Sequence, residues 1–107
     1  MNPQELQLMV ARARREQIRW FLLLTMNLAR PTDATLSMLL GVVRGTYPDA
    51  TELEVRRELD YLVGRELASI RVDPLEQVRA KLERYGIDVV EYTVDCDPGI
   101  ARPKAVV

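Results

Sequence analysis

The reactive side chains of this sequence are few, because histidine is absent and cysteine occurs once, at Cys96. Histidine is the usual general base and the commonest metal ligand, so no Ser/His or Cys/His catalytic pair can form. The acidic neighbours Asp95 and Asp97 disfavour ionisation of the lone thiol. We therefore expect no catalytic residues, and we expect a protein that binds and is not an enzyme.

Carboxylates near the end of the chain offer a second possible chemistry. Asp88, Glu91, Asp95 and Asp97 could approach a divalent cation, but their spacing lacks the pattern of an EF-hand loop. The sequence also contains neither a P-loop nor a G-x-G-x-x-G motif. The sequence therefore predicts no metal and no cofactor.

Arginine and lysine side chains suggest a third chemistry, the recognition of phosphate on double-stranded DNA. In the segment 52–64, Arg57 could reach a guanine edge and Tyr61 a phosphate, with Arg56 on the flank. In the segment 68–83, arginine and lysine lie on the polar side of an alternating pattern. The candidate DNA-binding residues are Arg56, Arg57, Tyr61, Arg71, Arg79, Lys81 and Arg84.

Acidic side chains argue against the interpretation that these residues bind DNA. The formal net charge is −1, and Glu54 and Asp60 are expected to share the outward face with Arg57. The same face could instead be solvated and joined by the pairs Glu52–Arg56, Glu54–Arg57 and Arg56–Asp60. A separate cluster, Arg12, Arg14, Arg15 and Arg19, could bind phosphate or an acidic partner, or form the solvated side of a helix. The sequence leaves these alternatives open.

These residues must be positioned by helices. The first helical segment is expected over residues 3–29, as one long helix or two nearly continuous ones. Its second part, WFLLLTMNLA (20–29), is apolar on every side and needs cover on every side. It is too short to cross a membrane, which takes about 20 apolar residues, so no membrane partner is expected. We expect a homodimer whose interface contains Trp20, Phe21, Leu24 and Leu28.

Two similar stretches, RPTDATL (30–36) and TYPDATEL (46–53), mark two further helix starts. Thr32 or Asp33 is expected to cap a helix that runs through Leu36 to Val43. Thr51 and Glu54 have the spacing of a capping box for the next helix. Two helices joined by a tight turn form a helix-turn-helix.

After Gly64 the apolar period changes from 3.6 to 2, which predicts a β-hairpin of strands 68–73 and 77–83. A short helix with Ile87, Val90 and Val94 on one side follows, although strand is also possible there. The sequence thus predicts a mainly α (α+β) winged helix-turn-helix domain over residues 1–94, with a two-stranded wing. Residues 95–107 are expected to form an extended or loose tail.

The segments VRRELDYLVGRELASI (55–70), AKLERYGIDVVEYTV (80–94) and PGIARP (98–103) resemble small winged-helix proteins of Mu-like transposable phages, which are often labelled ArsR-like regulators. The resemblance covers roughly residues 15–103. It implies a bacteriophage or prophage protein in the bacterial cytoplasm, with a role in DNA binding and transcription regulation. The alternative is a protein-protein interaction module in phage assembly or host takeover. The metal-sensing Cys/His pattern of ArsR sensors is absent.

Overall fold

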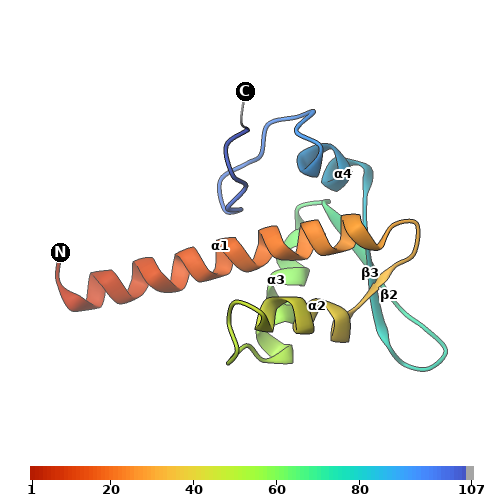
Figure 1. Cartoon of the computed structure of the whole chain (residues 1–107), viewed down its shortest axis with the longest axis horizontal. Coiled ribbons are helices and arrows are strands. Elements are labelled where there is room, and N and C mark those ends of the chain that lie inside the picture. The colour runs from red at the N-terminus through yellow and green to blue at the C-terminus, as the bar shows by residue number, and fades with distance from the viewer. Residues whose placement is uncertain (106–107) are drawn as a thin grey trace.

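A computed structural model describes residues 1–105, which form four helices and one three-stranded antiparallel sheet (Figure 1). The expected α+β class is therefore confirmed. The first helix, α1 (Pro3–Ala29), has the predicted bounds. The side chain of Asn2 caps it by accepting a hydrogen bond from the amide of Glu5, and proline occupies its first turn.

The second helix, α2 (Leu36–Arg44), begins later than the sequence suggested. Its N-cap is Thr35, whose hydroxyl accepts from the amide of Met38, so the expectation of a cap at Thr32 or Asp33 was wrong. Residues 34–35 are extended and pair with a neighbouring strand of the sheet, so the helix begins only at Leu36. The third helix, α3 (Glu52–Gly64), begins at the predicted cap, where the amide of Glu54 donates to Thr51 Oγ1.

The predicted hairpin is confirmed as β2 (Ala68–Val72) and β3 (Val78–Leu82), with Ile70 opposite Ala80. A further strand, β1 (Ala34–Thr35), pairs with the other edge of β3 and gives the order β1-β3-β2. The sequence analysis did not predict this third strand. A two-residue strand carries too little alternation to be seen in a sequence.

The fourth helix, α4 (Arg84–Val90), ends before Val94, which the sequence analysis had placed on its apolar side. Tyr92 adopts a positive φ of 62° just beyond the helix, and this conformation ends it. Val94 therefore lies outside the helix and is exposed. The following segment is irregular, as expected, but it is not loose. The amide of Ala101 donates to the carbonyl of Glu16 in α1 at 3.1 Å, and Figure 1 shows the segment returning to α1. Residues 106–107 of the predicted tail lie outside the described residues.

The core lies where the second half of α1 meets α2, α3 and the sheet. Ile18, Leu22 and Leu39 are fully buried there, together with Leu59 and Leu62 of α3. In contrast, every residue from 1 to 13 is exposed. Figure 1 shows these first turns of α1 extending beyond all other elements.

Candidate functional site

The exposed face of α3 has little free positive charge. Nε of Arg56 donates to Asp60 Oδ1 at 3.1 Å, so this predicted pair is confirmed. The predicted pairs Glu52–Arg56 and Glu54–Arg57 are not formed. Within residues 1–105 no ion pair includes Arg57, which is exposed. Arg57 therefore supplies the unpaired cation of this face.

Two α3 residues that were expected to point outward are instead held against α1. The carboxylate of Glu54 accepts hydrogen bonds from Nε and Nη2 of Arg14 at 2.8 and 2.7 Å. The ring of Tyr61 is half-buried, with the guanidinium carbon of Arg19 3.5 Å from its centroid. The outward orientation was therefore wrong for both residues, because α1 and the segment around Gly99 cover this side of α3.

The cations of the hairpin are largely paired with carboxylates. Arg71 and Arg79 lie directly opposite each other on β2 and β3, an arrangement that like charges disfavour. Asp33 accepts from Arg71 at 2.9 Å, and Asp73 accepts from Arg79 at 2.8 Å. The hydrogen bond from Arg79, with amide donors from Gln77 and Leu75, lowers the pKa of Asp73.

Two further predicted cations flank the hairpin. Lys81 is exposed and, within the described part of the chain, belongs to no ion pair. It borders a shallow cavity of about 130 Å³ that Arg71 and Arg79 also line. Arg84 lies at the start of α4 and reaches Asp88 at 3.3 Å, with 81% of its side chain exposed. Among the described residues, Arg71, Arg79 and Arg84 are thus each paired with a carboxylate, whereas Lys81 is not.

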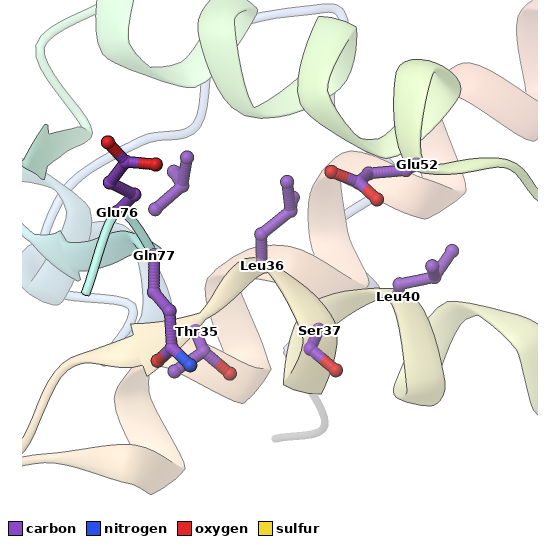
Figure 2. A pocket seen from close by; sticks show the side chains of 8 residues that line it. Thr35, Leu36, Ser37, Leu40, Glu52, Glu76 and Gln77 are labelled. Atoms are coloured by element: carbon purple, nitrogen blue, oxygen red, sulfur yellow. The ribbon is translucent and has the colours of Figure 1, made fainter. Parts of the chain in front are cut away.

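A groove of about 570 Å³ separates the hairpin turn from the first turns of α2 and α3. Leu36, Leu40 and Val78 give it apolar walls, and Glu52 and Glu76 are its charged residues. In Figure 2, Leu36 lies between Glu76, at the hairpin turn, and Glu52, at the start of α3. Three uncharged polar side chains complete the lining: Thr35, Ser37 and Gln77. The groove therefore combines apolar contact area with negative charge.

Sequence reasoning missed this groove because its two acidic residues are 24 positions apart and belong to different elements. A partial signal was present. Glu52 precedes the apolar stripe of α3, and Glu76 occupies the hairpin turn, so both were predictably exposed. Only the placement of the hairpin turn beside α2 and α3 brings the two carboxylates to one groove.

The arginine cluster of α1 serves mainly to join parts of the chain. Arg14 binds Glu54 and also Asp49, with Nη1 3.1 Å from Asp49 Oδ1, and these hydrogen bonds, above all the one to Glu54, raise the pKa of Arg14. Arg19 donates to Glu58 Oε1 at 2.9 Å. Arg12 pairs with Glu16. Within residues 1–105 Arg15 alone of the four has no ion-pair partner, and it is exposed.

Two further reactive groups, Cys96 and Tyr85, have raised pKa values. Burial, together with the nearby charge of Asp97, raises the pKa of the Cys96 thiol, although Arg102 opposes the shift. Burial is also the main cause of the raised pKa of Tyr85. No group of three or more potential metal ligands is present within residues 1–105.

The four residues predicted to form a dimer interface differ in how far they are exposed. Trp20 is 7% exposed and packs edge to face against Tyr92, with 6.4 Å between the ring centroids. Phe21 and Leu24 are half-buried, and Leu28 is 84% exposed. Leu28 thus offers the largest exposed fraction, and Trp20 is already covered by its own chain.

None of the helices in residues 1–105 combines the length and the apolar composition needed to cross a membrane. Comparison of the chain with protein-family models, with curated proteins and with solved structures found no match.

Proposed function

We propose that this α+β domain is a winged helix that works as a protein-binding module. The chain order supports the fold assignment, because helix, strand, two helices and a hairpin follow one another as in winged helix-turn-helix domains. The short β1 strand on β3 completes the sheet in the order β1-β3-β2. In this assignment α3 is the second helix of the helix-turn-helix, and the β2–β3 hairpin is the wing.

The observation that carries the proposed function is the charge of the surface between the wing and α3. A DNA-binding winged helix places this region against phosphate, where cations are favourable and carboxylates are not. Here the groove between them contains Glu52 and Glu76. Arg71 and Arg79 are already bound to Asp33 and Asp73. A partner with positive charge fits this surface better than a polyanion does.

The chemistry of the groove indicates the kind of partner segment. Leu36 and Val78 would contact an apolar side chain of the partner. Glu52 and Glu76 would each accept hydrogen bonds from a lysine or arginine, which are stronger than bonds between neutral groups. The proposed ligand is therefore a protein segment with one or more apolar residues between two basic residues. The phage resemblance suggests a phage or host protein as its source.

A displayed random-peptide library tests this proposal directly. We expect peptides selected on the wild-type protein to contain lysine or arginine on both sides of apolar residues. These peptides should lose at least about tenfold in affinity for the double variant Glu52→Gln/Glu76→Gln, which corresponds to about 1.4 kcal/mol. The matched control Glu83→Gln/Glu91→Gln removes two exposed carboxylates outside the groove and should bind like the wild type.

The competing DNA function makes opposite predictions. It expects salt-sensitive binding of mixed-sequence duplex DNA, with log affinity falling by about 0.9 per phosphate contact for each unit of log salt. It also expects Arg79→Ala/Lys81→Ala to weaken that binding. If fluorescence anisotropy detects such binding, or if selected peptides show no enrichment in basic residues, the protein-binding proposal fails.

A further inference from the structure

We propose that the outer face of α1 binds the same face of a second copy of this chain, with the two helices antiparallel and Gln17 at the two-fold axis. This inference goes beyond the proposed function, because it uses no residue of the groove. It concerns α1, whose first turns have no other element of residues 1–105 beside them (Figure 1).

An outer apolar stripe runs along nearly the whole of α1. At 3.6 residues per turn, its members and Gln17 fall within an arc of about 80°. The apolar members of this outer stripe are Leu6, Val10, Ala13, Phe21, Leu24 and Leu28.

The outer stripe is open to solvent in the single chain. Leu6, Val10 and Leu28 are 53%, 61% and 84% exposed, and Phe21 and Leu24 are half-buried. The opposite side of the same helix packs on α2 and α3 through fully buried residues. Contiguous apolar surface of this kind marks an interaction site on a small protein.

The order of the residues in the outer stripe identifies the partner as a second copy. When two α1 helices lie antiparallel about Gln17, Leu6 meets Leu28 of the second copy and Val10 meets its Leu24. Ala13, which is small, meets the large side chain of Phe21. Every apolar residue therefore faces an apolar residue, and each contact occurs twice, as a two-fold interface requires.

Gln17 sets the register of this pairing. The Tyr47 hydroxyl donates to Gln17 Oε1, which leaves the amide nitrogen of Gln17 free to bond across the two-fold axis. A single polar residue within an apolar helix seam specifies register, because any shift would leave it against apolar neighbours. A shift by one turn would also place Leu6 or Leu28 beyond its partner.

The spacing of the outer stripe suits two helices that pack along their length. Its steps alternate mostly between three and four residues, as in left-handed helix pairs that cross at about 20°. From Leu6 to Leu28 the contact would extend for about 33 Å. The projecting first turns of each α1 would thus be covered by the second half of the other.

Sedimentation and light scattering measure the predicted assembly. At high micromolar concentration we expect a mass of twice 12.3 kDa. The variants Val10→Glu and Leu28→Glu should each give the 12.3 kDa monomer with unchanged helix content, because both side chains are exposed in the single chain. Leu75→Glu is the matched control, since Leu75 is 78% exposed in the hairpin turn, and it should remain a dimer.

Thiol cross-linking with a short bismaleimide tests the orientation in a Cys96→Ser background. If the helices are antiparallel, two copies of Gln17→Cys should cross-link to each other. Leu6→Cys and Leu28→Cys should then cross-link only when the two variants are mixed. If the helices are parallel, two copies of each of these three variants should cross-link to each other.

The proposal is overturned by three results. The first is a wild-type chain that stays monomeric at high micromolar concentration. If that monomer co-sediments with phosphatidylglycerol vesicles, the outer stripe binds a lipid surface instead. The second is a dimer that survives both glutamate substitutions. The third is the parallel cross-linking pattern. Peptide binding by the groove is unaffected by any of them, so the two proposals fail independently.

Discussion

The side chain of Arg19 connects three parts of the chain that are far apart in sequence. It donates to Glu58 of α3 at 2.9 Å and to the carbonyl of Gly99 at 2.8 Å, and it stacks on Tyr61. The side chains of Arg19 and Glu58 are only 13% and 8% exposed. A buried charge that loses its partner is strongly destabilising, whereas an exposed pair contributes little.

We therefore expect Glu58→Ala to lower the free energy of unfolding by about 3 kcal/mol. Asp60→Ala removes a carboxylate from the same helix, but its pair with Arg56 is largely exposed. That variant should lose about 0.5 kcal/mol or less. Urea denaturation followed by circular dichroism measures both. Equal losses in the two variants would show that the buried Arg19–Glu58 pair contributes no more to stability than the exposed Arg56–Asp60 pair.

The carboxylate of Asp73 provides a pH-dependent contribution to stability. Its pKa is lowered in the folded chain by the hydrogen bond from Arg79 and by backbone amides. A lowered folded pKa stabilises the fold above the unfolded pKa, and this stability is lost as the pH falls below about 4. We expect Asp73→Asn to unfold with a shallower dependence on pH than the wild type across the acidic range. Urea midpoints measured from neutral pH downwards test this, and parallel curves for the two proteins would contradict it.

At the scale of elements, the segment after α4 acts as a strap across α1 and α3. Tyr92 donates to the carbonyl of Pro103 at 2.8 Å, and Arg102 donates to the carbonyls of Val89 and Val94 at 3.0 Å. The strap lies against α3 at Gly99, which has a φ of 109°. A Cβ at Gly99 would overlap the hydroxyl of Tyr61.

Gly99→Ala should therefore destabilise the protein by about 1–3 kcal/mol, because it combines backbone strain with a collision. Gly41→Ala is the matched control, since a Cβ at this exposed position of α2 meets no atom within 4 Å. That control should gain about 0.5–1 kcal/mol from helix propensity. Thermal unfolding gives both values, and hydrogen exchange at the Ala101 amide reports whether the strap has detached. A neutral Gly99→Ala would mean that the strap shifts without cost.

At the scale of the whole molecule, α1 has two parts with different surroundings. Its second half is packed against α2, α3 and the sheet, and residues 1–13 are exposed throughout. A chain that lacks residues 1–11 should therefore keep the free energy of unfolding of the dilute monomer to within about 0.5 kcal/mol. The same deletion removes Leu6 and Val10, so it should also prevent the proposed dimer.

Urea denaturation at low protein concentration and light scattering at high concentration separate these two effects. A large loss of stability in the dilute monomer would show that the first turns of α1 support the core. A truncated chain that still dimerises would place the interface elsewhere.

The sequence by itself determined much of the local structure. The cap at Thr51, the helix over residues 3–29 and the hairpin after Gly64 were all predicted. Each of these features depends on residues a few positions apart, because capping hydrogen bonds and apolar periods are short-range properties. The strand β1 was not predictable, since its two residues are held by pairing with β3 and not by their own pattern.

Only the tertiary structure decided which charges are free. Periodicity identifies the apolar side of a helix, but it does not say which element will cover the flanks of that side. Arg14 and Glu54 are 40 residues apart, and Arg19 and Glu58 are 39 apart. Packing α3 against α1 turned these charges into internal ion pairs, and folding the hairpin beside α2 brought Glu52 and Glu76 to one groove. The electrostatics of the candidate site is a long-range property, because charges act through space on whatever the fold places beside them.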